Sequence, residues 1–238
     1  MFSSSRRALC LSLAVITGAL SVGAAVAAGA AKAPTAASVL ALTKSALNTE
    51  RGVHIVVTTI NDKVKSSVVA DIGTNSGTET YTSGAETFTI SVTPTYAYLS
   101  GSKTGLVDIM GLSAAQQKKI GSQTLKMKKG TAQYTSFYTN LTAAAYSELL
   151  PAVKGTTLLS ARDKSTNGYQ LSWSTKATST APKTHSVMVV SSGSKPLPIK
   201  ETIRTSEGSS KTTFTRWGES VSIKVPTNTI AYSKVFSS

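Results

Sequence analysis

Hydrophobic residues and hydroxyl-bearing residues alternate along most of the chain, which is the pattern of strands with one buried face. The clearest example is ETFTISVT at residues 86–93, where Phe88, Ile90 and Val92 alternate with Thr and Ser. Such runs are separated by short polar turns, among them the Asn-Gly pair at 167–168, a hairpin signal. We expect about eleven strands, at residues 53–60, 64–72, 78–82, 86–93, 95–100, 122–130, 156–164 and 169–175, with roughly four more between 184 and 226.

Three segments have the spacing of amphipathic helices instead. The first covers residues 36–48, and the second covers 111–121, with Ser113 as its N-cap and Gly121 as its stop. The third and longest covers 131–153, where one apolar stripe consists of Tyr134, Phe137, Tyr138, Leu141, Ala145, Leu149 and Val153. The order helix, strands, two helices, strands predicts an α+β fold with one curved antiparallel sheet over about three helices.

The first thirty-one residues have the organisation of a secretory signal peptide. Arg6 and Arg7 form a positive end, an uncharged run follows, and small residues then dominate up to residue 33. We expect cleavage between Ala27 and Ala33, by the general or the twin-arginine export route. The alternative is an uncleaved membrane helix, although the Ala- and Gly-rich second half of the run inserts weakly. Residues 32–238 are then expected to form a single domain.

Cys10 is the only cysteine, and it precedes the apolar part of this segment. A bacterial lipid anchor needs a cysteine directly after the apolar core, so Cys10 is not expected to carry a lipid. After cleavage the chain would contain no thiol, and therefore neither a disulfide nor a thiolate metal site. The expected location is secreted or associated with the cell envelope, without an anchor through Cys10.

The chain is strongly basic, with 25 Lys and Arg against 11 acidic residues and a formal net charge of +14. Such a surface attracts anionic polymers or anionic lipid headgroups. The lysines are scattered, apart from two short runs at 116–120 and 126–130, and no aromatic-studded basic strand resembles a nucleic-acid platform. For an exported protein we expect an anionic membrane surface or cell-wall polymer as partner and no nucleic acid. The plain alternative is a solvated basic surface without a specific partner.

The sequence offers no catalytic constellation. Its two histidines, His54 and His185, lie in separate strand patterns and could share a metal ion only if those strands were neighbours. It has no Gly-x-Ser-x-Gly elbow, no HExxH motif and no phosphate-binding loop. Glu201 and Glu207 flank an expected hairpin, a spacing that chance explains. We therefore expect no enzyme activity, no metal and no cofactor.

Three stretches carry a resemblance to a known family. They are GLSAAQQKKIGSQTLKM at 111–127, KGTAQYTSFYTNLTAAAYSELL at 129–150 and SKPLPIKETIRTSEGSSKTTFTRWGESVSIKVP at 194–226. In their order of elements they resemble the exported LppX/LprG-type lipoproteins, which are similar in fold to the carrier LolA. The likeness covers most of residues 36–230. Leu125 stands where that family usually has Trp, and the expected cleavage region lacks the family's lipobox cysteine.

The resemblance implies a half-barrel sheet wrapped over helices, with an apolar cavity between them that holds the acyl chains of a lipid or glycolipid and carries them across the envelope. A monomeric lipid carrier is the expected function, and a non-catalytic envelope protein that binds anionic polymers is the alternative. The residues themselves also allow a filled core. The candidate cavity residues are Ile55, Val57, Phe88, Ile90, Val92, Phe137, Leu141, Ala144, Ala145, Leu149, Tyr169, Leu171, Trp173, Val187 and Val189.

Overall fold

The computed structural model of the protein describes residues 34–163, 167–178 and 181–236. Within these residues twelve strands form one sheet: β1 (Gly52–Asn61), β2 (Val64–Gly73), β3 (Gly77–Ser83), β4 (Glu86–Val92), β5 (Tyr96–Gly101), β6 (Thr124–Lys128), β7 (Thr157–Asp163), β8 (Gly168–Thr175), β9 (Thr184–Ser191), β10 (Pro198–Arg204), β11 (Gly208–Thr215) and β12 (Thr229–Ala231). The helices are α1 (Ala36–Leu47), α2 (Lys103–Met110), α3 (Ala114–Ile120), α4 (Ala132–Asn140), the 3-10 helix η2 (Ala143–Leu149) and α5 (Tyr232–Phe236).

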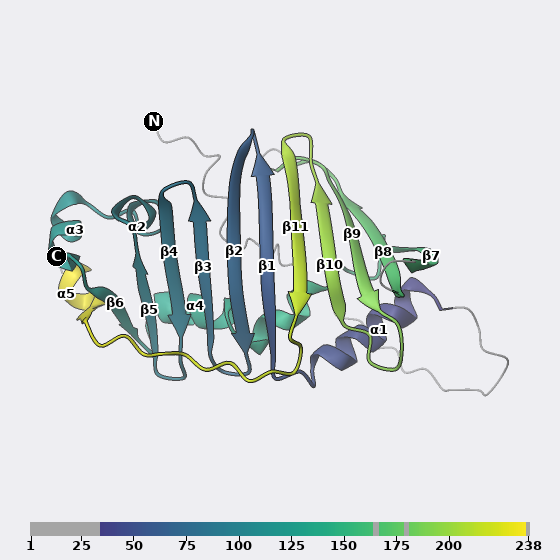
Figure 1. Ribbon diagram of the computed structural model, residues 1–238, viewed down its shortest axis with the longest axis horizontal. Helices are drawn as coiled ribbons and strands as arrows, with labels where there is room; N and C mark the ends of the chain where they lie inside the picture. The colour runs from purple at the N-terminus through teal and green to yellow at the C-terminus, as the bar shows by residue number, and fades with distance from the viewer. Residues whose placement is uncertain (1–33, 164–166, 179–180, 237–238) are drawn as a thin grey trace.

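The sheet is open, curved and almost entirely antiparallel (Figure 1). Its strand order is β12-β6-β5-β4-β3-β2-β1-β11-β10-β9-β8-β7, so β11 pairs with β1 and joins a meander of the first six strands to one of strands β7 to β11. The short β12 adds in parallel to β6 at one edge. The expected α+β class, with one curved antiparallel sheet over helices, is therefore confirmed, as a half-barrel of twelve strands.

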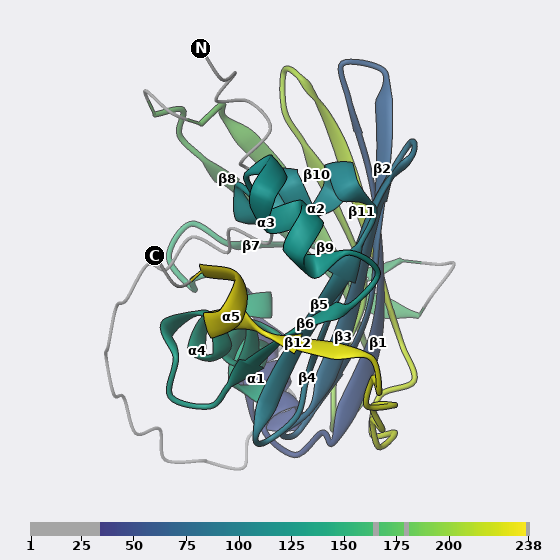
Figure 2. The same cartoon turned by 90° about the vertical axis from the view of Figure 1, so that its left-hand side faces the viewer.

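All the helices lie on one side of the sheet (Figures 1 and 2). Figure 2 shows them in two groups, with α2 and α3 above and α1, α4 and α5 below. We call the helix-bearing side the inner face and the opposite side the outer face. Because side chains alternate along a strand and paired residues point the same way, the strand register assigns each side chain to one face.

Local signals explain two helices that the sequence predicts. The α1 helix begins with a capping box between Thr35 and Ser38. The α3 helix begins with a second capping box, in which the backbone amide of Gln116 donates to the Ser113 hydroxyl and the Gln116 side chain accepts from the Ser113 amide. Gly121 follows with φ of 56°, a conformation that favours glycine, and ends the helix. Both helices, and the Ser113 cap, are confirmed.

The single helix expected at 131–153 is wrong. The chain forms α4, leaves helical geometry at Leu141 and Thr142, and continues as the 3-10 helix η2. Thr142 forms a parallel bridge to Gly73 at the end of β2, and its hydroxyl donates to the carbonyl oxygen of Tyr138. The helix is therefore interrupted at Leu141 and Thr142, where the chain contacts the sheet, although the apolar stripe continues through these residues.

Two further elements differ from expectation. The α2 helix, capped by Ser102, was not predicted. The fourth strand expected before residue 226 is also absent, since residues 216–228 contain neither helix nor strand. This segment instead runs along the lower ends of the strands to β12 (Figure 1), where Ser76 donates its hydroxyl to the carbonyl oxygen of Val221.

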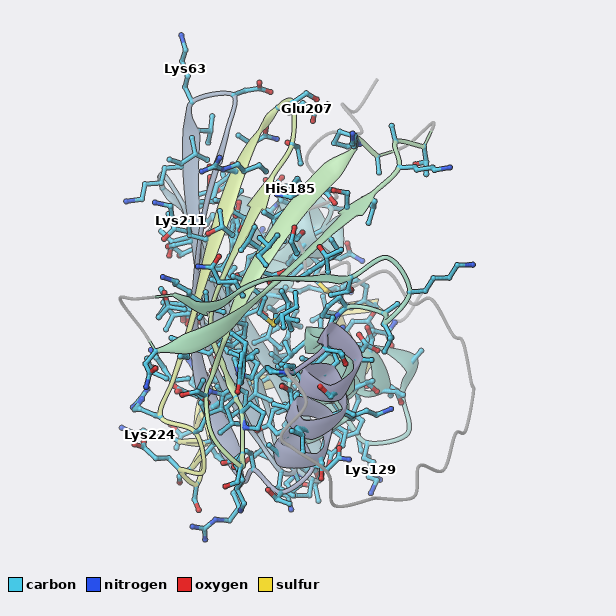
Figure 3. The ribbon with its side chains drawn as sticks, turned by 90° about the vertical axis from the view of Figure 1, so that its right-hand side faces the viewer. Lys63, Lys129, His185, Glu207, Lys211 and Lys224 are labelled. Atoms are coloured by element: carbon cyan, nitrogen blue, oxygen red, sulfur yellow. The ribbon has the colours of Figure 1, made fainter. Side chains whose placement is uncertain are left out.

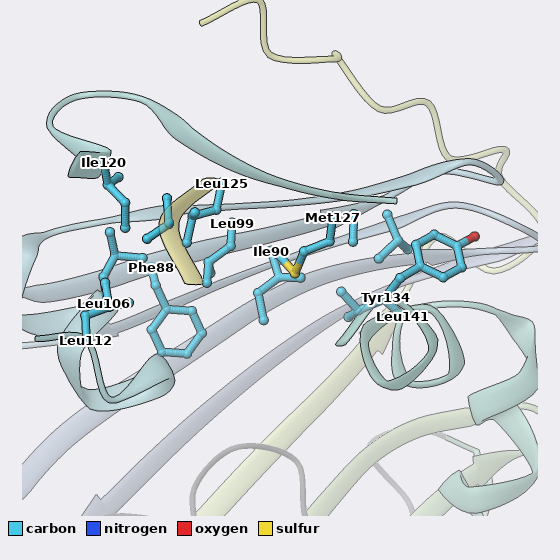
Figure 4. Close-up of a cluster of buried hydrophobic side chains, with 13 residues drawn as sticks. Phe88, Ile90, Leu99, Leu106, Leu112, Ile120, Leu125, Met127, Tyr134 and Leu141 are labelled. Atoms are coloured by element: carbon cyan, nitrogen blue, oxygen red, sulfur yellow. The ribbon is translucent and has the colours of Figure 1, made fainter. Parts of the chain in front are cut away.

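The buried side chains form three clusters between the helices and the inner face. The first fills the space between β4, β5 and β6 and helices α2 to α5 (Figure 4). The second lies in the middle, where Leu47, Tyr146 and the inner residues of β1, β2 and β11 meet. The third joins α1 to β8 and β9. Buried side chains therefore cover the inner face at both ends and in the middle, and partly exposed apolar residues pack beside each cluster.

The signal peptide expected at residues 1–31 lies outside the described residues, as does Cys10. Within residues 34–163, 167–178 and 181–236, no helix combines the length and the apolar character that crossing a membrane requires.

Candidate functional site

The middle of the inner face contains a row of side chains that the helices cover only in part. Cross-strand pairing places Glu201 beside Thr212, Thr212 beside Val57, Val57 beside Val68, and Val68 beside Tyr81. We call these five residues the central row. Val57, Tyr81 and Glu201 are partly exposed, and the row crosses β10, β11, β1, β2 and β3. At the spacing of neighbouring strands it spans about 19 Å along the sheet.

Apolar side chains from other elements border the central row. Leu149 and Leu150, at the end of η2, and Leu197, before β10, pack on the middle cluster and remain partly exposed. Together with Val57 and Tyr81 they form a partly exposed apolar group in the middle of the inner face, which we call the accessible apolar surface. This surface is what an apolar ligand would contact.

The structure distributes the fifteen candidate cavity residues over four environments. Seven are buried in the clusters: Ile55, Phe88, Ile90, Val92, Leu141, Ala145 and Leu171. Five are partly exposed on the inner side: Val57, Phe137, Leu149, Tyr169 and Trp173. Of these five, Val57 belongs to the central row and Leu149 borders it, whereas seven of the fifteen candidates belong to packed core.

Two of the candidates do not face the inner side. Val187 and Val189 pair with Ser172 and Gln170 of β8, whereas the inner residue Leu171 pairs with Met188. The two valines therefore point to the outer face, and the inner residues of β9 are Ser186, Met188 and Val190. The prediction that Val187 and Val189 line an inner cavity is wrong. Ala144 is exposed on η2, and its place in a cavity lining stays a prediction.

Charged side chains are divided between the two faces of the sheet. Among the strand side chains that the structure describes, every basic one points outward: His54, Lys65, Lys126, Lys128, His185, Lys200, Arg204 and Lys211. Three of the four acidic ones, Glu79, Glu86 and Glu201, point inward. The fourth, Asp71, points outward. The inner face is thus apolar and acidic, and the outer face is basic.

Glu79 is the most deeply buried of these carboxyl groups, with 8% of the residue exposed. It stands between Ala70 of β2 and Ile90 of β4, next to Tyr81 on the same face of β3. No other described residue gives it a hydrogen bond or an ion pair. Its oxygens are not fully enclosed either, because Asn61 Oδ1 is the only fully enclosed side-chain oxygen or nitrogen without a partner among the described residues. Burial raises the pKa of Glu79 from 4.5 to about 7.

Glu201 occupies the end of the central row opposite Tyr81, between Met188 of β9 and Thr212 of β11. Burial raises the pKa of this carboxyl from 4.5 to about 7 as well. Glu207, which the sequence placed near it, is exposed in the β10–β11 turn. The two therefore form no carboxylate pair. Glu79, which no sequence motif marked, and Glu201, which the sequence suggested only as half of a chance pair with Glu207, are candidates for a functional role.

The outer face carries a polar cavity at the lower ends of β1 to β3. His54 Nδ1 lies 2.7 Å from Asp71 Oδ1, and Arg216 donates from Nη2 to the same oxygen at 2.9 Å. A cavity of about 210 Å³ opens here, bordered also by Thr78 and Glu219. Because Asp71 contacts both His54 and Arg216, this arrangement ties the 216–228 segment to the sheet.

A second cavity on the outer face, of about 270 Å³, is lined by His185, Val187, Thr202 and Arg204. Lys211 pairs with Thr202 and adds a second long cation beside it. Figure 3 shows Lys211 pointing away from the sheet on the side opposite α1. His54 and His185 lie on strands separated by β11 and β10, so they share no metal site. Among the described residues there is no cluster of three metal-ligating side chains.

No family model and no curated protein sequence matches the chain. Similar solved structures include LprF from Mycobacterium bovis, with 14% identity over 80% of this chain and 96% of that one and a TM-score of 0.48. The Mycobacterium tuberculosis lipoprotein LppX has 14% identity over 79% of this chain and 99% of that one, with a TM-score of 0.44. An uncharacterised conserved protein from Thermus thermophilus has 10% identity, coverage of 82% and 97%, and a TM-score of 0.44.

LprF and LppX are of the LppX/LprG type that the sequence motifs resemble, and the expected resemblance is confirmed at this level. At these identities and TM-scores the similarity describes the general course of the chain. The function is therefore inferred from the side chains on the inner and outer faces of the sheet.

Proposed function

We propose that the protein is an exported, non-catalytic carrier of acyl lipids that holds the apolar part of its ligand on the central row. In this proposal residues 1–31 direct export and are removed, and residues 32–238 act as a single monomeric domain. No lipid is attached through Cys10. The ligand is a lipid or glycolipid, and the helices cover its acyl chains on the inner face.

The observation that carries the proposal is the accessible apolar surface around Val57 and Tyr81. Val57, Tyr81, Leu149, Leu150 and Leu197 all pack against the middle cluster and remain partly exposed, so they form one apolar group beside the central row. Soluble domains normally bury such side chains or use them for binding. Each methylene group removed from water contributes about 0.8 kcal/mol without needing a hydrogen-bond partner. A surface of this kind therefore suits acyl chains of varied structure.

The basic outer face supports an anionic membrane surface as the second partner. Lys65, Arg204 and Lys211 lie on three strands of this face, and its one acidic strand residue with a described side chain, Asp71, is already paired with Arg216. Such a face would hold the carrier near anionic headgroups while the inner face stays free for the ligand. The same face favours the second candidate function, a cell-envelope protein that binds anionic polymers.

Purification from the native host followed by mass spectrometry of organic extracts tests the carrier function. We expect an acyl lipid in near-stoichiometric amount. The Val57→Trp variant, which fills the partly exposed centre of the row, is expected to lose most of that lipid. Val56→Trp is the matched control, because Val56 is the adjacent residue of β1 and points outward.

Three outcomes separate the alternatives. Lipid in the wild-type protein and in Val56→Trp, but not in Val57→Trp, supports the carrier. Equal lipid in all three proteins contradicts the central row as the site. No acyl lipid in any of them, together with salt-sensitive retention on isolated cell wall, favours the polymer-binding function.

A further inference from the structure

The inner face combines apolar side chains with a buried carboxyl group that has no partner. A carboxyl that serves the fold is normally paired or hydrogen-bonded when it is buried, as Asp71 is on the outer face. Glu79 is 8% exposed and receives neither kind of contact from another described residue. A side chain that opposes folding and contributes no internal bond is the kind of local conflict that marks a functional position.

The surroundings of Glu79 leave its carboxyl able to meet a ligand. Its neighbour on β2 is the small Ala70, and its oxygens are not fully enclosed. Two residues before Glu79, on the same face of β3, Gly77 lies against the junction of α4 and η2. A Cβ atom added to this glycine would be only 1.9 Å from the carbonyl oxygen of Leu141. One step up the strand, Tyr81 belongs to the central row. Glu79 therefore sits between the helix contact and the accessible apolar surface.

Charge on this face is of one sign. Glu201 is one end of the central row, Glu79 lies next to Tyr81 at the other end, and Glu86 lies at the start of β4. No described strand side chain on the inner face is basic. Once these carboxyl groups are charged, above about pH 7, an anionic headgroup on the sheet would meet carboxylates and no strand cation among the described residues, so electrostatics disfavours it.

We propose that Glu79 is the polar anchor of the lipid site, that it donates a hydrogen bond to a hydroxyl or ester oxygen of the ligand, and that it and Glu201 select acyl lipids without net negative charge. This inference rests on the proposed carrier function and adds the chemistry of the headgroup to it. The apolar surface supplies affinity, and the two carboxyl groups supply discrimination.

Protonation links this anchor to pH. The raised pKa of Glu79, about 7, keeps the carboxyl neutral in mildly acidic solution, where it can donate a hydrogen bond. Above that pH the carboxylate only accepts. The titratable side chains of its own strand, of β4 and of the helical elements packed here are Tyr81, Glu86, Tyr134, Tyr138, Tyr146 and Glu148. None of them is basic, so no cation on these elements counteracts the effect of burial.

Binding of two fluorescent probes with the same acyl chains, a diacylglycerol and a phosphatidylglycerol, tests the inference at pH 5.5 and pH 8.5. The wild-type protein is expected to bind diacylglycerol about tenfold more weakly at pH 8.5 than at pH 5.5, the effect of one hydrogen bond. It is expected to prefer diacylglycerol over phosphatidylglycerol at least tenfold at pH 8.5, where both carboxyl groups are charged. Glu79→Gln keeps an N–H donor and is expected to bind equally at both pH values. Glu79→Met, similar in length but apolar, is expected to bind about tenfold more weakly than wild type at pH 5.5.

A pyrene-labelled alkane, which has no oxygen, and the exposed-turn variant Glu207→Gln serve as controls. The alkane is expected to bind wild type and Glu79→Met alike, which also shows that the variant is folded. Equal affinity of diacylglycerol for wild type and Glu79→Met at pH 5.5, or equal affinity of wild type for both lipids at pH 8.5, would overturn the inference and leave the carrier function standing. Failure of the wild-type protein to bind any probe would overturn both.

Discussion

The buried carboxyl of Glu79 makes the stability of the protein depend on pH in a predictable direction. Its pKa rises from 4.5 to about 7 on folding. Between these values the folded state binds more protons than the unfolded state, so the free energy of unfolding falls as the pH rises. The stabilising contribution is present below pH 4.5 and is lost by the time the pH passes 7. Replacing Glu79 with Gln removes this dependence.

The size of the effect follows from the two pKa values. A difference of one in pKa corresponds to about 1.36 kcal/mol, so the change from 4.5 to about 7 corresponds to about 3 kcal/mol. Because only 8% of Glu79 is exposed, solvent screening reduces this free-energy difference only slightly. Urea unfolding of wild type and Glu79→Gln at pH 4 and pH 8.5 measures it. From pH 4 to pH 8.5, the free energy of unfolding of the variant is expected to rise by about 3 kcal/mol relative to that of wild type.

Glu207→Gln makes the same chemical change at an exposed turn, and its difference from wild type should stay constant with pH to within about 0.5 kcal/mol. A Glu79→Gln difference that is the same at both pH values would refute the reasoning. It would mean that the carboxyl is solvated or paired in the folded protein.

Other expected outcomes concern packing and the outer face. Leu99→Ala, at a fully buried position of the first cluster, should lower the free energy of unfolding by about 2–5 kcal/mol, whereas Leu42→Ala, at a half-exposed position of α1, should change it by less than about 1 kcal/mol, both by urea titration. Tyr146→Phe removes the hydroxyl that donates to the Ile72 carbonyl oxygen and should cost about 1–3 kcal/mol in the same assay. The double variant Arg204→Ser and Lys211→Ser should weaken sedimentation with phosphatidylglycerol vesicles at low salt and leave neutral vesicles unaffected; equal sedimentation with wild type would contradict the role of the outer face.

Alternation predicted the strands well because most of them bury one face only. ETFTISVT became β4, with Phe88, Ile90 and Val92 inside as expected. The same reasoning failed on β9, where residues 187–190 are apolar without interruption, so the pattern does not say which side faces the helices. The register with β8 decides it, and register is a property of the folded sheet.

The helix expected at 131–153 shows a second limit of the sequence pattern. Its apolar stripe is continuous, and nothing local marks Leu141 and Thr142 as an end. The break comes from the bridge between Thr142 and Gly73, two residues far apart in the chain. Tertiary contact overrides helix periodicity here, as it commonly does over short segments.

The two carboxyl groups of the central region could have been found from the sequence. In TETYT, Glu79 shares the parity of Tyr81, and in KETIR, Glu201 shares the parity of Ile203, so both acids lie on the apolar side of their strands. The sequence analysis looked for pairs of acids and passed over single acids at inward positions. The sequence does not show whether these carboxyl groups have hydrogen-bond or ion-pair partners, which depends on the packed structure.

Photo-crosslinking with a diacylglycerol that carries a diazirine in its acyl chain tests the central claim most directly. Our account predicts that labelled peptides come from β1 and β3, that Val57 and Tyr81 are the modified residues or lie next to them, and that Val57→Trp abolishes the labelling. Labelling confined to outer-face residues, or labelling that Val57→Trp leaves unchanged, would contradict a lipid site on the inner face.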